Sequence, residues 1–315
     1  MSYGATMPHT IAVLRGGDVS FSQSLVEGEQ TLRSLLSHGF FTMDILIDTD
    51  GVWTMHGVPT DPHHVFTTAS LVVDTTHMKH APYQELASRM GALILFSDIE
   101  DLPITREDRY RILRQHGIPV PDTSVVRSHK QPTGEQLRAI WNTYHTPLMV
   151  RPITRTQEIS SKIVKGFKEF VETIHQYYEK GIDTHVLTYK SVPSYSLAVL
   201  PHFRNQDLYM PLWVKTTPEK SVLPTAHSIV DTQSSLSEEE KQDLFNHARK
   251  VCTVLDVRHP VCLDFIPTKK GYLVVNVDTN PSLRSDGRFM QSLRTTGVDI
   301  GEYVQSYLNQ HGVIR

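Results

Sequence analysis

The chain has 315 residues, of which 39% are hydrophobic and 21% charged, and its formal net charge is −3. This composition is typical of a globular protein, and the weak negative charge provides no basic field for nucleic acid or an anionic membrane. No apolar run is long enough for a membrane-spanning helix, and the first ten residues lack the apolar core of a signal peptide. Two cysteines without CxxC spacing fit a reduced, cytoplasmic protein.

The first hundred residues alternate between strand and helix patterns. A β-rich run at 10–14 ends at Gly16-Gly17, and leucines at helical spacing follow it. Further strands are expected at 41–47, 71–73 and 92–96, a small hairpin at 51–57 and a helix at 82–90. A strand, a glycine turn and a helix are the opening of an α/β unit, and the N-terminus of such a helix can bind an anion. A Gly-Gly pair is nevertheless a weak signal, because it more often marks a tight turn without a ligand. The alternation predicts a small doubly wound domain.

Residues 105–188 predict a compact α+β unit. Thr105 is expected to cap a helix that Gly117 ends. Further helices are expected at 133–144 and 166–180, and strands at 148–152, 157–164 and 184–189. The strand at 148–152 carries a cation, Arg151, close to its end.

The remaining residues begin with an antiparallel pair of strands, expected at 195–203 and 207–214. A polar stretch at 215–224 is long enough to act as a lid. Ser237 opens a helix with a capping-box pattern, and a closing helix is expected at 298–309.

Between these two helices, two apolar runs flank the polar turn at 268–271, which predicts an antiparallel hairpin. Side chains alternate along a strand, so Asn276 and Asp278 point to one face, and the turn sets Asp264 roughly opposite Asn276. Buried carboxylates are costly unless they are paired or bind a metal, and a few oxygen ligands suit Mg²⁺. The alternative is a solvated sheet face with an Asx turn at Asp278.

In this order, the segments resemble the ATP-grasp ligases, and most closely the D-alanine–D-alanine ligases. The resemblance is carried by residues 13–17 with Ser24-Leu25, by His77, by residues 117–121, 150–152, 215, 224–226 and 263–265, and finally by residues 277–281. It implies an α/β (α+β), three-domain ATP-grasp fold with an N-terminal doubly wound domain, divided at 1–104, 105–188 and 189–315. It also implies that ATP binds between the last two domains, and that an acylphosphate formed from one amino acid is attacked by the amine of another.

The resemblance assigns roles on the hairpin and beside it. Asp264, Asn276 and Asp278 would bind Mg²⁺ or Mn²⁺, with the carboxylate and the amide of the family's Asp, Glu, Asn pattern exchanged. Arg106 and Arg151 stand where the family has lysines that bind the ATP phosphates. A guanidinium keeps the charge but differs from an ammonium in reach and hydration, and the alternative is that both arginines are solvated or ion-paired at the surface.

Further roles follow from the same resemblance. Lys215 matches a lid lysine that binds ATP near its γ-phosphate, and Ser24, Lys215 and Ser282 are expected to take part in catalysis. Gly17 and His77 are expected to lie near an amino acid substrate. A cytoplasmic homodimer acting on small amino acids, without nucleic acid or membrane, is the expected setting.

Several positions depart from the family pattern. The loop at 154–158 contains no glycine, and Leu187-Thr188 replaces an acidic pair. Cys262 stands where the family has an arginine, and no glutamate occurs at 18–23 to hold a substrate ammonium. These departures leave a second hypothesis open, a catalytically degenerate pseudo-ligase that binds nucleotide or acts as a scaffold, and a third, a structural partner of an active ligase.

Overall fold

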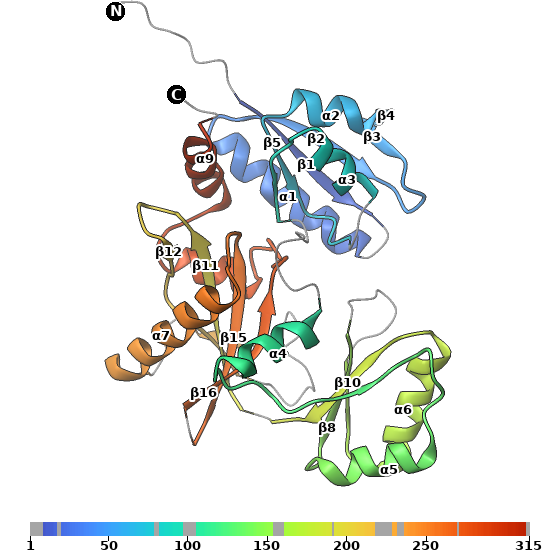
Figure 1. Cartoon of the computed structure of the whole chain (residues 1–315). Coiled ribbons are helices and arrows are strands. Elements are labelled where there is room, and N and C mark those ends of the chain that lie inside the picture. Colours follow the sequence, from blue (N-terminus) through green and yellow to red (C-terminus); the bar gives the residue numbers. More distant parts are fainter. Residues whose placement is uncertain are drawn as a thin grey trace, which may run out of the picture.

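The structure is a computed structural model, and it describes residues 9–17, 20–78, 82–96, 105–153, 161–190, 192–217, 229–231, 236–269 and 271–312. The described residues form three β-sheets that follow one another along the chain, and Figure 1 shows each of them with helices beside it. None of the described helices has the length and hydropathy that crossing a bilayer requires.

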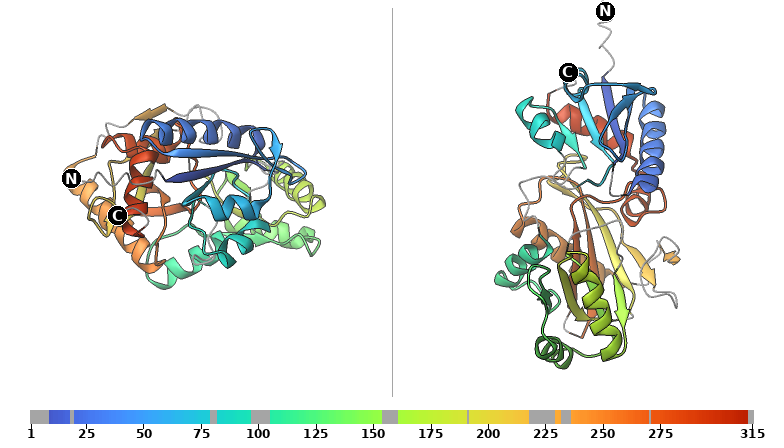
Figure 2. Two further views of the ribbon diagram at one scale, coloured as in Figure 1. Left: turned by 90° about the horizontal axis from the view of Figure 1, so that it is seen from above. Right: turned by 90° about the vertical axis from the view of Figure 1, so that its right-hand side faces the viewer.

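The first sheet is wound on both faces, as the alternating pattern predicted. Its strand order is β4-β3-β2-β1-β5-β6, and β1 runs parallel to both β2 and β5. Ile11 and Val13 of β1 face one core, whereas Ala12 and Leu14 face the other. Figure 2 shows α1 on one side of this sheet and α2 and α3 on the other. The elements are β1 (Thr10–Gly16), α1 (Phe21–Ser37), β2 (Phe41–Ile47), β3 (Trp53–Met55), β4 (Val58–Pro59), α2 (Pro62–Thr68), β5 (Leu71–Asp74), α3 (Pro82–Arg89) and β6 (Ile94–Leu95).

The second sheet is antiparallel, with the order β7-β10-β8-β9. Its strands are β7 (Ser124–Val126), β8 (Leu148–Pro152), β9 (Lys162–Val164) and β10 (Thr184–Thr188), and its helices are α5 (Gly134–Thr143) and α6 (Phe167–Glu179). Both helices pack on the face that carries Val150 and Val186. The opposite face, with Arg151 of β8, is therefore left toward the third sheet.

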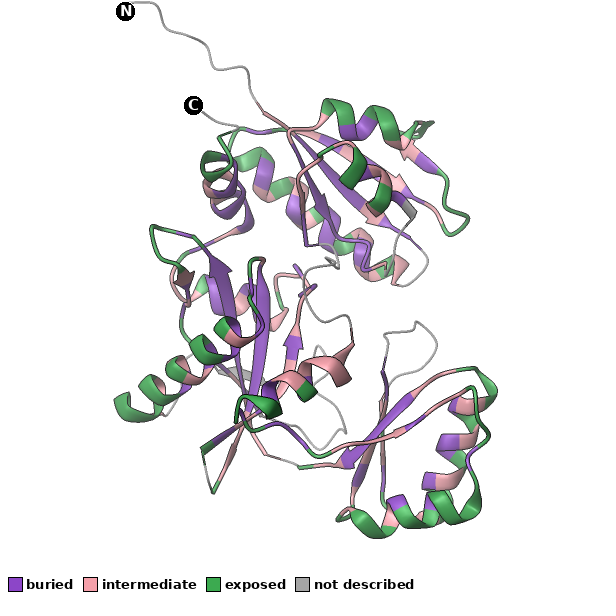
Figure 3. Ribbon diagram, in the orientation of Figure 1, coloured by how far each residue is buried: buried purple, intermediate pink, exposed green. Residues whose placement is uncertain are grey.

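The third sheet is built around β11 (Ser194–Pro201) and the hairpin of β15 (Val261–Thr268) and β16 (Gly271–Asp278). Its remaining strands are β12 (Leu208–Tyr209), β13 (Val214–Thr217) and β14 (Ile229–Asp231), and the helices around it are α4 (Arg106–Gln115), α7 (Glu238–Val254), α8 (Arg288–Arg294) and α9 (Ile300–Gln310). Helices α4 and α7 share one core with this sheet. Helices α8 and α9 share another core with α1 and the first sheet. Figure 3 shows buried residues concentrated in the strands and exposed ones on α5 and α7.

Most expected elements are present, and several differ from the prediction. The stretch expected as a lid from Lys215 begins as strand β13, while residues 218–224 lie outside the described residues. Helices α2 and α8 and strands β7 and β14 were not predicted. The strand expected at 207–214 is the two-residue β12, and β13 begins only at Val214. The glycine-free loop at 154–158 also lies outside the described residues, as does the segment 224–226. The expected domain boundaries stay a prediction, but α4 packs with the third sheet.

Candidate functional site

A cavity of about 260 Å³ lies between the second and third sheets. Apolar side chains from both sheets line part of it, among them Met149 of β8 and Ile266 of β15. Its charged lining consists of four cations and one carboxylate, namely Arg106, Arg151, Lys190, Arg288 and Asp264. A concave site with an apolar wall and converging charged groups is a typical ligand site.

The hairpin contributes the wall of this cavity with the register that the sequence predicted. Asp264 of β15 pairs directly with Asn276 of β16. A bulge follows, because Phe265 pairs with Val274 and leaves Val275 as the extra residue. Nδ2 of Asn276 donates a hydrogen bond of 3.1 Å to Oδ2 of Asp264, which links the two side chains across the hairpin.

Asp264 is only 4% exposed and is held by an ion pair that the sequence analysis missed. Nη1 of Arg288, at the start of α8, lies 2.8 Å from Oδ1 of Asp264. The same oxygen accepts a hydrogen bond of 2.6 Å from Ser196 on β11. A buried carboxylate needs such partners, and here the protein itself supplies them.

A metal ion bound by Asp264, Asn276 and Asp278 does not fit this arrangement. The amide nitrogen that Asn276 turns toward Asp264 cannot bind a cation, and its Oδ1 accepts 3.0 Å from Nη2 of Arg106. Flipping the amide would set two acceptors against each other and two donors against each other. Among the described residues, no group of three or more His, Cys, Asp or Glu side chains could hold a metal.

Arg106 and Arg151 both line the cavity, and Asp278 is the carboxylate whose charge acts on Arg106. Nη2 of Arg151 donates to the hydroxyl of Tyr110 at 2.8 Å, and that hydroxyl donates to the carbonyl of the bulged Val275 at 2.6 Å. Within the described part of the chain, neither arginine forms an ion pair and both Nε atoms are buried without a partner. Burial, and next the charge of Arg151, lower the pKa of Arg106 to about 9, so it remains a cation at pH 7.

Half-buried cations without an ion-pair partner are costly, and these two repel each other, because the charge of Arg151 lowers the pKa of Arg106. His185, which pairs with Arg151 across the sheet, does not balance them. Burial, and next the charges of Arg151 and Arg106, lower the pKa of His185 to about 3 and keep its ring neutral. The cavity is therefore built to receive an anion.

Lys215 and Cys262 do not contribute to the cavity in the way that was expected. Thr216 lines the cavity, and because side chains alternate, Lys215 lies on the opposite face of β13. Burial, and next the charge of Asp264, raise the pKa of the Cys262 thiol well above its usual range. Cys262 is therefore a neutral core residue, and Arg288 brings a positive charge to the same face from α8.

The other predicted residues gather around Glu27 of α1, which the sequence analysis missed. Its fully buried carboxylate accepts from Nε2 of His77 at 2.8 Å and from Oγ of Ser282 at 2.6 Å. It also accepts from the backbone N–H of Leu283 at 3.0 Å and from Gln23 at 2.8 Å. These donors occupy all four lone-pair positions of the carboxylate.

The remaining two predicted residues of this region have structural roles. Oγ of Ser24 accepts from the N–H of Gly16 at 2.8 Å, which ties α1 to the end of β1. Gly17 has φ +83° and donates its N–H to Ile47 at 2.8 Å. This positive φ is the reason for glycine at position 17, and a Cβ there would also approach the flexible side chain of Met78 to 2.8 Å.

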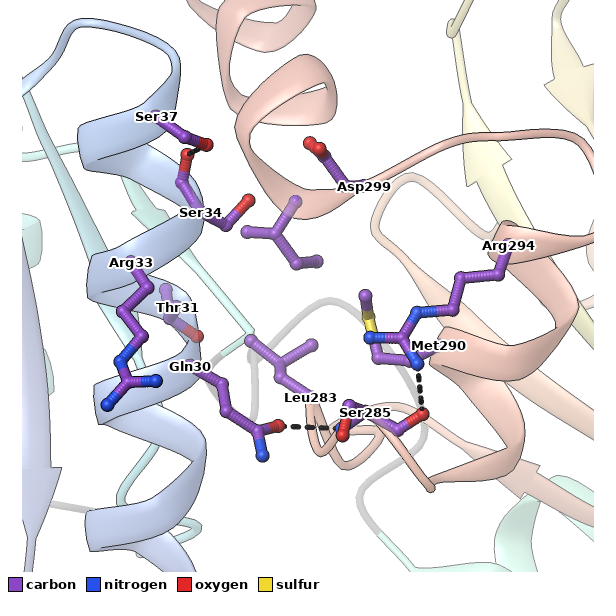
Figure 4. Close-up of a pocket in the computed structure, with 11 residues that line it drawn as sticks. Gln30, Thr31, Arg33, Ser34, Ser37, Leu283, Ser285, Met290, Arg294 and Asp299 are labelled. Atoms are coloured by element: carbon purple, nitrogen blue, oxygen red, sulfur yellow. Dashed lines mark hydrogen bonds between the residues drawn. The ribbon is translucent and has the colours of Figure 1, made fainter.

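A second cavity of about 390 Å³ lies on the other side of α1, against the loop before α8 and the start of α9. Figure 4 shows Gln30 bonded to Ser285 across it, and Arg294 bonded to the carbonyl of Ser285. Its lining is polar and contains none of the predicted site residues. It lies where α1 packs beside the C-terminal helices and is distinct from the cationic cavity.

A sequence signal could have indicated one of the two missed residues, Glu27, but not the other, Arg288. Glu27 lies at helical spacing from Ser24 and Thr31, so a carboxylate stood in the buried stripe of α1. Arg288 follows Gly287, the N-cap of α8, but its contact with Asp264 depends on how α8 packs and has no local pattern.

Comparisons with known proteins agree with this architecture. A family model described as D-ala D-ala ligase C-terminus matches residues 112–309. No curated protein sequence matches the chain.

Solved structures resemble the chain along almost its whole length. D-alanyl-alanine synthetase A from Vibrio cholerae superposes with a TM-score of 0.75 at 15% identity, covering 97% of this chain and 99% of that one. The VanG D-Ala:D-Ser ligase from Enterococcus faecalis gives a TM-score of 0.75 at 15% identity, with 96% and 99% covered. The D-alanine–D-alanine ligase from Bacillus anthracis complexed with ATP gives 0.73 at 15% identity, with 96% of both chains covered.

At this identity the structures show the fold, which is the predicted ATP-grasp fold. The family match covers well over half of the chain, from α4 to α9. This protein therefore belongs to the D-alanine–D-alanine ligase family.

Proposed function

We propose that the protein is an ATP-dependent carboxylate–amine ligase that joins two amino acids, with the nucleotide bound in the cavity between the second and third sheets. The observation that carries the proposal is the pair Arg106 and Arg151, two cations without an ion-pair partner among the described residues. Guanidinium groups match the geometry of phosphate groups and can bind them through two parallel hydrogen bonds. The ATP in the similar Bacillus anthracis structure supports the choice of nucleotide.

In the proposed reaction, a carboxylate oxygen of the first amino acid attacks the γ-phosphorus of ATP and ADP leaves. The amine of the second amino acid then attacks the acyl carbon and loses a proton. The bond between the acyl carbon and the phosphate oxygen breaks, and inorganic phosphate leaves with that oxygen. The contribution of Arg106 and Arg151 is to hold the phosphates in place and to neutralise their charge, which is most of what phosphoryl transfer requires. Tyr110 orients Arg151 through its hydroxyl.

The Mg²⁺ or Mn²⁺ of the family stays outside this proposal, because Asp264 and Asn276 are already bound to Arg288 and Arg106. The amino acid site predicted at Gly17 and His77 stays a prediction, and so do the catalytic roles predicted for Ser24 and Ser282. Lys215 also stays a prediction, although its side chain lies away from the cavity.

The test is ADP release from ATP over a panel of D- and L-amino acids, D-serine included, supplied singly and in pairs. Arg151→Met is expected to lower amino-acid-dependent turnover by about 100-fold or more, because phosphate alignment is lost. Arg138→Met is the matched control, since Arg138 is exposed on α5 and lies on the far side of the second sheet. Equal losses in both variants would overturn the assignment of Arg151.

A second candidate is a nucleotide-binding protein without ligase turnover. It is favoured by Glu27, whose carboxylate has no lone pair left for a substrate ammonium. Calorimetric binding of ATP together with no ADP release across the panel would select this candidate.

A further inference from the structure

The carboxylate on the hairpin of the third sheet is paired with a cation of the protein, Arg288 of α8. Asp264 is the only carboxylate among the described residues that line the cavity, and its charge is balanced by Arg288. Ser196 takes the second lone pair of the same oxygen, and Asn276 donates to the other oxygen. A divalent ion would have to displace a guanidinium that is already in place.

Arg288 also has unused donors. Nη1 is the atom that contacts Asp264 and, at 3.4 Å, Ser196. Within the described residues, no partner takes the hydrogens of Nε and Nη2, and Arg288 lines the cavity. A planar guanidinium can bind a carboxylate on one edge and a phosphate on another.

The net charge of the cavity also favours an anion that is neutralised by protein side chains. Arg106, Arg151, Lys190 and Arg288 face one lining carboxylate, and Asp278 adds a second negative charge that acts on both Arg106 and Arg288. Positive charge remains in excess after both carboxylates are counted. Side-chain cations of the protein can therefore neutralise the negative charge of a bound polyphosphate.

We propose that the cavity binds the polyphosphate of its nucleotide without a divalent metal ion, with Arg288 in the place where a metal would neutralise charge. This inference rests on the proposed nucleotide site. It assigns Arg288 a direct contact with phosphate, and it assigns Asp264 the role of holding Arg288.

The experiment is isothermal calorimetry with ATP and, separately, with inorganic tripolyphosphate, each in excess Mg²⁺ and in EDTA. For the wild-type protein the dissociation constants in the two conditions are expected to agree within about threefold. Arg288→Ala is expected to weaken binding in EDTA by about tenfold or more, and Mg²⁺ is expected to restore part of it, because Asp264 becomes free to bind the metal.

Two further variants keep the test decisive. Arg294 lies on the same helix but outside this cavity. The Arg294→Ala variant should therefore bind ATP and tripolyphosphate as tightly as the wild type in both conditions. If Arg288→Ala does not fold, the double variant Arg288→Met with Asp264→Asn removes both charges of the pair. Its binding should be weak in EDTA, and Mg²⁺ should not restore it.

Wild-type binding that is more than about tenfold tighter with Mg²⁺ than with EDTA would overturn the inference and leave the proposed nucleotide site intact. Binding of neither ligand in either condition would overturn both. Wild-type affinity of Arg288→Ala in EDTA would remove Arg288 from the phosphate site.

Discussion

The carboxylate of Glu27 accepts a hydrogen bond of 2.8 Å from Nε2 of His77, and both side chains are buried. Glu27 belongs to α1, and His77 follows the end of β5. The same carboxylate binds Ser282 and the backbone of Leu283, which follow β16. One buried charge thus connects the first sheet to the hairpin of the third, so the two parts of the molecule are coupled at this point.

Replacing this carboxylate should destabilise the protein strongly. Glu27→Gln places an amide nitrogen against donors and leaves His77 without its charged partner. Losing one member of a buried ion pair costs about 3–5 kcal/mol, measured as the free energy of unfolding in urea. Glu29→Gln on the same helix is the control, because its pair with Arg33 is exposed and is worth less than about 1 kcal/mol. Similar losses in both variants would show that the Glu27 network is not a stabilising connection.

The effect of Glu27→Gln should depend on pH. Burial alone raises the pKa of Glu27, but the hydrogen bond and charge of His77, with the bonds of Ser282 and Gln23, outweigh it and hold the pKa below its ordinary 4.5. A lowered pKa gives stability that is complete above the unfolded value and is lost as pH falls through the folded one.

The stability difference between wild type and Glu27→Gln is therefore expected to be full at neutral pH and to shrink below pH 4.5. Asp74 has the opposite shift, since burial raises its pKa, but it is present in both proteins and cancels in the difference. Urea unfolding at a series of pH values measures the difference. A difference that does not change down to about pH 3 would contradict an ionised Glu27.

The sequence predicted the hairpin well because its information is local. The polar turn that ends at Gly271, and the alternation on either side of it, determine the register that pairs Asp264 with Asn276. Thr105 and Ser237 were also found, and both cap their helices as expected. Such features depend on residues a few positions apart.

What the sequence analysis missed depends on tertiary packing. Arg288 reaches Asp264 only because α8 packs under the third sheet, and a seven-residue helix has little periodicity to detect. In α1, the leucines suggested the buried face, yet Leu36 is 58% exposed and Glu27 is buried. The partners of Glu27 are more than 250 residues away at Ser282 and Leu283, which no spacing rule connects.

The hydroxyl of Tyr110 should matter for anion binding as well as for stability. It is the group that joins Arg151 to the bulged Val275, at 2.8 and 2.6 Å. Tyr110→Phe removes two hydrogen bonds, each worth about 0.5–1.5 kcal/mol, and frees Arg151 to move. Affinity for tripolyphosphate is expected to fall about three- to tenfold in calorimetry. Tyr272→Phe is the control, because no hydrogen bond joins its hydroxyl to a described residue, and a fall in that variant would indicate a general packing effect.

Arg106 is expected to lower the free energy of unfolding of the unliganded protein and to raise the affinity for polyphosphate. Its pKa is lowered to about 9 by burial and by Arg151, so keeping it charged costs folding free energy at pH 7. Arg106→Met is therefore expected to raise the unfolding free energy without ligand by roughly 1 kcal/mol. Saturating tripolyphosphate at about 100 times Kd stabilises the wild type by about 2.7 kcal/mol and should stabilise the variant much less. Arg111→Met, an exposed neighbour on α4, should leave both values unchanged. A large loss of stability in Arg106→Met would instead mean that its bond to Asn276 is structural.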